Sequence, residues 1–480
     1  MNRLFYGDCL DVLKNSIEDE SIDLIYIDPP FNSKRNYNVL FEAIDMSDVK
    51  AQKEAFADTW SNVKYLDQLA LIQDLRLDLF KFLNTLDRIN VSKSVVSYLT
   101  TMAYRILYMH CKLKSTGSFY LHCDPTMSHY LKIVCDLIFS KSNFRNEIIW
   151  CYRGGGSSRR EFRRKHDVIL RYSKSSHFVF FPDSIRVPYQ AEGIQRKDDS
   201  MWGKHKGTNK IYKPHPLGKI PEDWWLIDAL DSNDPERLHF PTQKPEALLE
   251  RIISASSNEG DLVADFFCGC GTAVAVAQRI NRRWIGVDIS HLAVRLILNR
   301  VMEPYRNDNG KYVEIKNSIE VTGFPRDIAS AHELATGTKK GRIKFQDWVI
   351  EVLMDGVSNP KKVGDGGYDG YLTLYRDAKT RDVLLIEVKS GNVNVGDLRK
   401  FIYVVDHEKA AMGVWVCFAD QVTRGMSAIA QQAGYYDQEA FGSRYPRIQI
   451  ITVEELLEGK TVAHPNPAVF NVTFKRAGRK

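Results

Sequence analysis

The stretch from residue 262 to residue 288 constrains the fold more than any other part of the sequence. An apolar run at 262–266 leads into Phe-Cys-Gly-Cys-Gly-Thr, and helical spacing of apolar residues follows at 273–280. A second apolar run, 284–287, ends at Asp288. A strand, a helix and a second strand in this order form a βαβ unit, which requires a parallel sheet. The sequence therefore predicts an α/β fold.

A second buried strand is predicted near the N-terminus. Residues 22–27 form a near-continuous apolar run that ends at Asp28-Pro29-Pro30-Phe31. Such runs are typical of strands that are buried on both faces of a parallel sheet. Because α/β proteins bind their ligands at the carboxyl ends of such strands, we expect a functional site there.

Changes of pattern along the 480 residues predict two domains. The first spans 1–325, and its periodicity becomes irregular at about 174–240, where proline, glycine and aromatic residues are frequent. A compositional break at 326–341 is typical of a linker. Residues 342–460 have the pattern of a second, small α/β domain, and 461–480 form a basic tail.

The composition is that of an ordinary globular chain, with 44% hydrophobic and 26% charged residues. No apolar run approaches the ~20 residues that span a bilayer, and the N-terminus lacks the pattern of a signal peptide. The eight scattered cysteines favour reduced thiols over a disulfide framework. We therefore expect a cytoplasmic protein with no membrane partner.

Positive charge is concentrated in the middle of the chain. Residues 151–214 hold 15 Lys and Arg against 6 Asp and Glu, although the formal net charge of the whole chain is only +6. A solvated basic face is the simpler interpretation. The charge alternates with aromatic residues, however, and this pattern favours a polyanion with stackable bases. These aromatic residues are Tyr152, Phe162, Tyr172, Trp202 and Tyr212.

The turn after residue 266 has the features of a nucleotide-type site. Gly269 and Gly271 allow the backbone to approach a ligand closely, and a helix N-terminus follows. Asp288 stands at the tip of the next strand, where an acid can bind a ribose diol. A dinucleotide fingerprint is disfavoured because the third glycine of Gly-x-Gly-x-x-Gly is missing. Cys268 and Cys270 lack the partner spacing of a zinc site.

Asp28-Pro29-Pro30-Phe31 can bind and activate an amine. The two prolines fix the backbone and remove N–H donors, so carbonyl groups point outward. A carboxylate and one such carbonyl can accept two hydrogen bonds from one NH₂ group, which draws the nitrogen lone pair out of conjugation with a ring. Phe31 offers a stacking face for a base that has left its helix. An ordinary turn after a strand is the alternative.

Four motifs in one order resemble the amino-methyltransferases of DNA. They are Asp28-Pro29-Pro30-Phe31, Thr242-Gln243-Lys244-Pro245, Phe267-Cys268-Gly269-Cys270-Gly271 and Gly286-Val287-Asp288. The catalytic motif precedes the donor-binding motif, which is the beta-class arrangement of many bacterial restriction-modification methyltransferases. The resemblance covers roughly residues 1–325. It implies a Rossmann-like, seven-stranded methyltransferase fold that depends on S-adenosylmethionine, with an inserted recognition region at about 153–240.

The resemblance also implies the roles of individual residues. Asp28 and the Pro29 carbonyl would hold the target amine, Pro30 would complete the motif, and Phe31 would stack on the base. S-adenosylmethionine would be held by Asp8, Lys244, Asp265, Phe267, Gly269, Gly271 and Asp288. The partner would be double-stranded DNA, and a homodimer is a possible assembly. The expected phosphate contacts are Arg159, Arg160, Arg163, Arg164 and Lys165.

Two details bear on the target base. Asp at position 28 favours adenine N6 over cytosine N4, and the lack of a Pro-Cys pair disfavours methylation of cytosine at carbon 5.

Many relatives have Asp-Pro-Phe before the glycines, whereas this chain has Asp265-Phe266-Phe267. We expect a less constrained turn there, with donor binding retained.

The second domain carries its own constellation. Asp369 precedes a strand at 371–375, and the hairpin partner at 383–388 ends in Glu387-Val388-Lys389. Glu387 and Lys389 share one face at period two, so two carboxylates could hold Mg²⁺ beside a lysine. A helix before them could add Gln346.

This constellation resembles the PD-(D/E)xK nuclease superfamily, in particular the Mrr-type restriction nucleases. The resemblance implies a restriction-endonuclease-like domain, with Asp369 and Glu387 as ligands of Mg²⁺. Two positions depart from the pattern: Tyr368 stands where proline is often found, and Gln346 where glutamate is common. A surface acid pair beside a lysine is the structural alternative, and a degenerate domain that binds DNA without cutting it is another.

The sequence thus predicts a site-specific DNA methyltransferase in a restriction-modification or defence context, modifying adenine N6 by base flipping and direct transfer. Mg²⁺-dependent cleavage by the C-terminal domain is one extension of this prediction. The alternatives are a C-terminal module that only binds DNA or a partner, specificity for cytosine N4, and methylation of RNA.

Overall fold

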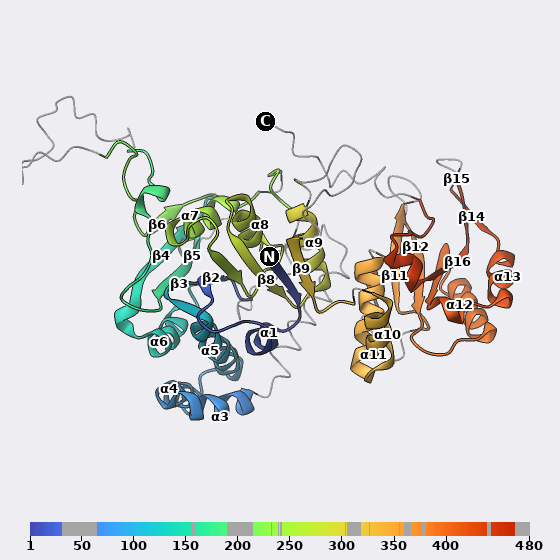
Figure 1. The fold of residues 1–480 in the computed structure, drawn as a ribbon, viewed down its shortest axis with the longest axis horizontal. Coiled ribbons are helices and arrows are strands. Elements are labelled where there is room, and N and C mark those ends of the chain that lie inside the picture. The colour runs from blue at the N-terminus through green and yellow to red at the C-terminus, as the bar shows by residue number, and fades with distance from the viewer. Residues whose placement is uncertain are drawn as a thin grey trace, which may run out of the picture. The chain divides into compact units, whose positions relative to one another are not determined.

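The computed structural model describes most of the chain in two units. The described residues are 1–30, 65–154, 160–189, 215–231, 233–238, 240, 242–302, 304, 318–325, 327–354, 356–359, 366–375, 381–438 and 443–465. The last segment of the N-terminal unit ends at Val321, and the main segment of the C-terminal unit begins at Thr322. Each unit is a β-sheet with helices packed on it (Figure 1).

A nine-stranded sheet forms the centre of the N-terminal unit, in the order β6-β4-β5-β3-β2-β7-β8-β1-β9. The strands are β1 (Asn2–Tyr6), β2 (Ile22–Ile27), β3 (Leu113–Cys123), β4 (Phe144–Cys151), β5 (His166–Ser173), β6 (Trp224–Leu226), β7 (Leu262–Asp265), β8 (Arg283–Asp288) and β9 (Ile319–Thr322). Strands β3, β2, β7, β8 and β1 are parallel, whereas β5 is antiparallel to β3. The α/β, Rossmann-like prediction is confirmed. The short strands β6 and β9 extend the expected seven strands at the two edges.

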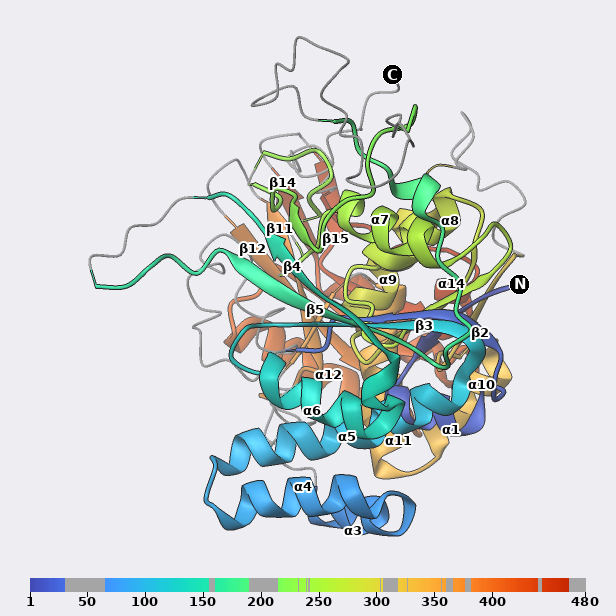
Figure 2. The ribbon, with the colours of Figure 1, turned by 90° about the vertical axis from the view of Figure 1, so that its left-hand side faces the viewer.

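Helices cover both faces of this sheet. Figure 2 shows α7, α8 and α9 on one face and α1, α5 and α6 on the other, with α3 and α4 beyond α5. The helices are α1 (Cys9–Asn15), α3 (Tyr65–Leu75), α4 (Leu77–Arg88), α5 (Lys93–Lys112), α6 (Ser128–Phe139), α7 (Glu246–Ser256), α8 (Thr272–Arg279) and α9 (His291–Met302). On α5, the helical spacing of Leu99, Met102 and Ile106 places all three fully inside the core.

The strand order creates a switch point between β2 and β7. These two strands are neighbours and run parallel. The strand that follows β2 in the chain, β3, lies on its far side, whereas β8 follows β7 and lies on the opposite side. In open α/β sheets, a crevice forms outside the carboxyl ends of the two strands at such a point. The ends of β2 and β7 are Ile27 and Asp265.

The C-terminal unit is built on a five-stranded sheet in the order β10-β11-β12-β13-β16. Its elements are α10 (Ile328–Thr336), α11 (Lys339–Asp347), a π-helical turn (Trp348–Leu353), β10 (Val357–Ser358), β11 (Gly370–Tyr375), β12 (Arg381–Val388), α12 (Val395–His407), β13 (Met412–Cys417), α13 (Arg424–Gln432), β14 (Tyr435–Gln438), β15 (Ser443–Pro446), β16 (Ile448–Thr452) and α14 (Val453–Leu457). Strands β11 and β12 form an antiparallel hairpin, and β12, β13 and β16 are parallel. The expected second α/β domain is therefore present.

The interval 326–341, which the sequence predicts as a linker, is largely helical. It contains α10 and the start of α11. Asp327 caps α10 by accepting a hydrogen bond from the backbone N–H of Ser330. Ala331 and Ala335, four residues apart, are fully buried in the core of the C-terminal unit. The linker prediction was wrong because small alanines at helical spacing form a packing face despite their weak hydropathy.

Two further features concern the chain as a whole. In the part of the chain that the structure describes, no helix has both the length and the apolar character needed to cross a membrane. All eight cysteines are free thiols, and six of them are buried. The expectation of reduced thiols is confirmed.

Candidate functional site: an acidic edge of the sheet

Four aspartates gather at one edge of the N-terminal sheet because the strands that carry them are parallel and in register. Tyr6 on β1 lies opposite Asp288 on β8, and Asp265 on β7 lies opposite Gly286 on β8. Asp8 follows β1 by two residues, and Asp28 follows β2 directly. The strand ends therefore carry Asp8, Asp28, Asp265 and Asp288. We call this group the acidic edge.

Asp28 forms an ion pair with Lys244. The Nζ of Lys244 donates to Oδ2 of Asp28 and to the carbonyl of Thr242, at 3.3 Å for the latter. Both side chains are largely buried, with 16% of Asp28 and 9% of Lys244 exposed. The sequence predicted Lys244 as a donor-site residue, and the structure adds its direct pairing with the predicted catalytic carboxylate. Pro29 and Pro30 follow Asp28 as expected, whereas Phe31 lies outside the described residues.

The glycine-rich turn between β7 and α8 depends on glycine at two positions. Gly269 and Gly271 have φ angles of +53° and +75°, which side chains rarely adopt. A Cβ atom on Gly271 would lie 2.6 Å from Cγ1 of Ile297. The backbone N–H of Gly269 donates to Oδ2 of Asp288 at 2.8 Å. The turn is therefore fixed against the acid at the tip of β8.

Asp265 is the most deeply buried member of the acidic edge. Burial, reinforced by the negative charges of Asp28 and Asp288, raises the pKa of Asp265 to about 8. Its Oδ1 accepts a hydrogen bond from the backbone N–H of Phe267 at 2.9 Å. Asp265 therefore keeps its proton at neutral pH in this structure. A cation bound at the edge would favour its ionised form.

Asp8 is held by an arginine from α5, which lies on the same face of the sheet as α1 (Figure 2). Arg105 on α5 donates through one nitrogen to both carboxylate oxygens of Asp8, at 2.8 and 2.7 Å. Asp8 also caps α1 by accepting from the backbone N–H of Leu10. Arg105 is almost fully buried, and about a third of Asp8 is exposed. Asp8 therefore has a structural partner in addition to the donor-side role that the sequence predicts.

A row of hydrogen-bonded side chains on the neighbouring strands approaches the acidic edge, and the sequence did not predict it. The phenol of Tyr26 hydrogen-bonds to Nδ1 of His122 at 2.9 Å, and Nε2 of His122 lies 3.4 Å from Oδ2 of Asp167. Burial acts to raise the pKa of Asp167, but the hydrogen bond and charge of His122 outweigh it and hold that pKa below its usual value. Tyr26 stands two residues before Asp28 and so shares its side of β2. This two-residue spacing is the only feature of the sequence that could have pointed to Tyr26.

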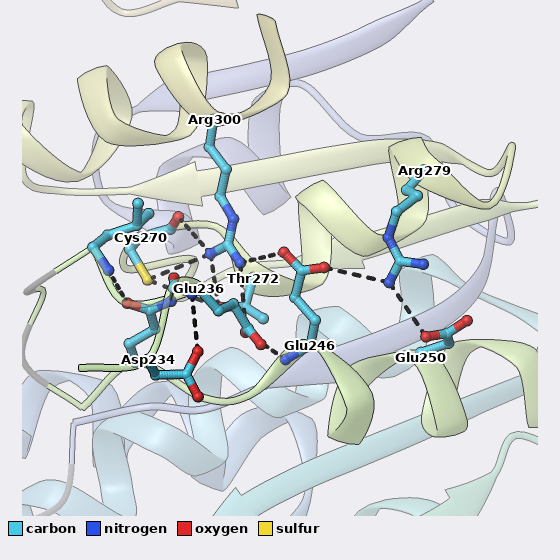
Figure 3. A network of polar contacts seen from close by, with 10 residues as sticks. Asp234, Glu236, Glu246, Glu250, Cys270, Thr272, Arg279 and Arg300 are labelled. Carbon is cyan, nitrogen blue, oxygen red and sulfur yellow. Dashed lines mark hydrogen bonds and ion pairs between the residues drawn. The ribbon is translucent and has the colours of Figure 1, made fainter. Parts of the chain in front are cut away.

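Arg300 on α9 joins three segments of the site (Figure 3). Its guanidinium donates to Oε1 of Glu246 at 2.6 Å and to the hydroxyl of Thr272 at 3.1 Å, and it lies 3.8 Å from Oε1 of Glu236. Glu236 in turn accepts from the backbone N–H of Glu246 at 2.6 Å. Only 9% of the Arg300 side chain is exposed. Arg300 thus ties the segment before Lys244 to the starts of α7 and α8.

The segment before Lys244 also packs on the glycine-rich turn. A Cβ atom on Gly269 would lie 3.0 Å from the ring of Phe240. The side chain of Gln243 accepts from the backbone N–H of Leu238 and donates to the carbonyl of Glu236, each at 2.8 Å. These contacts fix the backbone that presents Lys244 to Asp28.

The basic residues expected to contact phosphates lie between β4 and β5. Arg160, Arg163 and Arg164 are exposed, and Lys165 is half-buried. Arg159 lies outside the described residues, as do parts of the predicted recognition region. Lys165 accepts through its backbone carbonyl from the N–H of Tyr152 at 3.2 Å. This contact closes the base of the loop.

In the C-terminal unit the structure brings the four predicted residues together. Gln346 donates to Oδ1 of Asp369 at 2.8 Å, and the backbone N–H of Val388 donates to Oδ2 of Asp369 at 2.8 Å. Lys389 forms an ion pair with the largely buried Glu387. Burial acts to lower the pKa of Lys389, but the charges of Glu387 and Asp369 outweigh it and raise that pKa. Among the described residues, no group of three or more His, Cys, Asp or Glu side chains converges as a metal site.

Comparison with known proteins agrees with the two units. Residues 22–299 match the N6_N4 methyltransferase family model, which is described as "DNA methylase". Residues 343–458 match the family described as "NACHT-associated inactive Restriction Endonuclease 1". The first match covers more than half of the chain.

Individual relatives match over the same part of the chain. The type II methyltransferase M1.MboII of Moraxella bovis is 29% identical over 301 residues, which are 60% of this chain and 92% of that protein. The DNA adenine methyltransferase YhdJ of Escherichia coli (strain K12) is 28% identical over 300 residues, covering 62% of this chain and 82% of that protein. The solved structure of the PvuII DNA methyltransferase (cytosine-N4-specific) gives a TM-score of 0.40 at 17% identity, covering 66% of this chain and 91% of that one.

The raised pKa of Asp265 predicts a pH-dependent stability. Between about pH 4, where an unfolded aspartate titrates, and about pH 8, the folded state holds a proton that the unfolded state has released. The free energy of unfolding should therefore fall as pH rises through this window. Asp265→Asn keeps the acceptor for Phe267 and should reduce the fall, as measured by urea denaturation from about pH 6 to about pH 9. Asp11→Asn, at an exposed position of α1, should keep the wild-type slope.

The Arg300 contacts predict an unequal effect of two arginines that both pair with Glu246. Arg300→Gln leaves Glu246 and Glu236 without their buried cation and should lower the free energy of unfolding by roughly 1–3 kcal/mol. Arg279 also lies 3.4 Å from Glu246, but 47% of its side chain is exposed. Arg279→Gln should cost less than about 0.5 kcal/mol. Equal losses in the two variants, measured by urea denaturation, would contradict this assignment.

Proposed function

The chain belongs to the N6/N4 family of DNA methylases, and on that premise we propose that it transfers a methyl group from S-adenosylmethionine to an exocyclic amino group in double-stranded DNA. The observation that carries the proposal is the ion-paired Asp28 at the end of β2, directly beside the glycine-rich turn after β7. One group of residues can thus bind an amine while the neighbouring group binds the methyl donor.

The acidic edge suits a cationic donor. S-adenosylmethionine, when bound, supplies an electrophilic methyl group on a positively charged sulfur. In our proposal Phe267, Gly269 and Gly271 form its cradle, because only glycine tolerates the backbone of the turn and the close approach of Ile297. Asp288, fixed by the N–H of Gly269, would bind the ribose hydroxyls. Asp8 would add negative charge around the donor, and Asp265 would do so once the cationic donor favours its ionised form.

Asp28 acts on the target amine. Its carboxylate and the carbonyl of Pro29 each accept a hydrogen bond from the NH₂ group, which makes the nitrogen lone pair available. As the nitrogen takes the methyl group, the sulfur of the donor would keep the electron pair of the broken bond. The nitrogen would give up one proton, and the Asp28 carboxylate would accept it. Lys244 holds Asp28 in place and balances its negative charge.

The proposed target is adenine N6. Asp at position 28 supports this choice, as does the similarity to the DNA adenine methyltransferase YhdJ. Phe31 would stack on the flipped base. Since several relatives are type II methyltransferases, we propose that the reaction takes place in a restriction-modification or defence context. A homodimer is part of the proposal on resemblance alone.

Methylome sequencing of plasmid DNA from cells that express the chain tests this proposal. We expect one adenine-containing motif to be methylated by the wild type and unmethylated with Asp28→Ala, because the amine loses its acceptor. Asp28→Ala should still bind S-adenosylmethionine in calorimetry, and Asp11→Ala, at an exposed position of α1, should methylate normally. Methylated cytosine N4 would contradict only the choice of base. An unmethylated plasmid with the wild type would contradict the proposed function.

We further propose that the C-terminal unit binds DNA or a partner without cutting DNA. The family that it matches is described as inactive. Both oxygens of Asp369 already accept protein hydrogen bonds, Glu387 is paired with Lys389, and glutamine stands at position 346. Magnesium prefers a regular set of oxygen ligands, and these residues fit it poorly.

A cleavage assay separates this proposal from the nuclease alternative. Unmethylated plasmid should remain supercoiled with the wild type in Mg²⁺ or Mn²⁺, and Asp369→Ala and Lys389→Ala should behave identically. Weaker retention on a DNA column after removal of residues 326–480, compared with the full chain, would identify the ligand as DNA. Metal-dependent nicking that Asp369→Ala abolishes would show that the domain is a working nuclease.

A further inference from the structure

The loop between β4 and β5 carries a phenylalanine that the fold leaves in solvent. Phe162 is 97% exposed, more than any other large apolar side chain in the described part of the chain. A single exposed leucine at a helix surface is ordinary, but a phenylalanine ring with this exposure has almost no contact that could stabilise it. Its neighbours along the chain, Glu161 and Arg163, are charged and exposed.

The residues around Phe162 suit a polyanion. Arg160, Arg163 and Arg164 are exposed on either side of it, and Lys165 follows. Glu161 is the nearest acid in the sequence, and it is paired with Arg164 at 2.8 Å. A ring between arginines can stack while the guanidinium groups contact phosphates.

Strand register relates this loop to Asp28. Cys151 pairs with His166 where the β4–β5 hairpin opens into the loop, and Cys123 at the carboxyl end of β3 pairs with Val168. Because β3 is parallel to β2, the loop leaves the sheet at the edge where Asp28 lies.

A row of hydrogen-bonded side chains connects the end of this loop to β2, the strand that precedes Asp28. Asp167 contacts His122, which contacts Tyr26 on β2. Phe162 is five residues before Asp167, so at most about 17 Å of extended chain separates them. This length lets the ring reach a duplex whose target base is at Asp28.

We propose that Phe162 inserts into the base stack of the DNA duplex and fills the space that the flipped target base leaves. This inference rests on the proposed methyltransferase function. A base can reach Asp28 only by leaving the helix, and the cost of unpairing and unstacking it opposes methylation. Apolar side chains that enter a base step offset such a cost in other DNA-binding proteins. The adjacent arginines would hold the loop on the phosphates while the ring enters.

The test compares two duplexes that contain the methylated motif found by sequencing. In one duplex the target base is correctly paired, and in the other it faces a mismatch that already weakens its pairing. We expect Phe162→Ala to slow methylation of the paired duplex by roughly 10- to 100-fold, because the unstacked step is no longer filled. On the mismatched duplex its rate should lie within about threefold of the wild type, since the base leaves at less cost. Phe162→Trp should retain the wild-type rate on both duplexes.

Two controls distinguish the possible failures. Arg163→Ala should weaken binding to both duplexes alike and reduce the salt dependence of affinity, with no recovery on the mismatched duplex. Unchanged thermal unfolding and donor binding of Phe162→Ala would show that the exposed residue is not needed for folding. A wild type inactive on both duplexes would overturn the proposed function itself.

Either of two results would overturn the proposed insertion of Phe162. Phe162→Ala could match the wild type on the paired duplex, or it could slow both duplexes equally. A fluorescent 2-aminopurine at the target position gives a direct reading, because its emission rises when it unstacks. That rise should be smaller with Phe162→Ala than with the wild type on the paired duplex and equal on the mismatched one.

Discussion

Repulsion among the four aspartates at the carboxyl edge of the N-terminal sheet is the constraint on which the rest of the site depends. Parallel strands in register bring these carboxylates together, and burial removes most of the water that would screen them. The structure compensates these charges in three ways: by ion pairs, by a backbone hydrogen bond and by a retained proton. Arg105 pairs with Asp8, Lys244 pairs with Asp28, and the N–H of Gly269 donates to Asp288. Asp265 remains, and it keeps its proton.

This arrangement explains why distant segments must meet at the site. Lys244 can reach Asp28 only if the chain before α7 is held in one conformation, and Arg300, Gln243 and Phe240 hold it through contacts with α7, α8 and the glycine-rich turn. The segment that presents the cation for Asp28 is thus the same one that packs on the turn after β7. Displacing it would disturb both halves of the site together.

The sequence predicted the fold and the members of the acidic edge because both depend on local patterns. Apolar runs identified β2, β7 and β8, and in a parallel sheet the residues after such runs must share an edge. The partners could not be predicted in this way. Arg105 is 97 residues from Asp8, and His122 is 96 residues from Tyr26, so their contacts depend on strand order and helix placement. The linker prediction failed because it relied on composition alone. The helical spacing of Ala331 and Ala335, which are both buried in the core, determines the local structure.

The C-terminal unit shows why a motif predicts geometry better than it predicts chemistry. Gln346, Asp369, Glu387 and Lys389 converge as the sequence indicated, since a hairpin with a helix against it leaves few other arrangements. Cleavage would require carboxylate oxygens that are available to a metal ion, and here those of Asp369 accept bonds from Gln346 and Val388. An amide at position 346 donates to Oδ1 of Asp369, whereas a carboxylate there would have no hydrogen to donate, so glutamine engages an oxygen that a metal would need. The same four positions can therefore stabilise a fold in one protein and bind a metal in another.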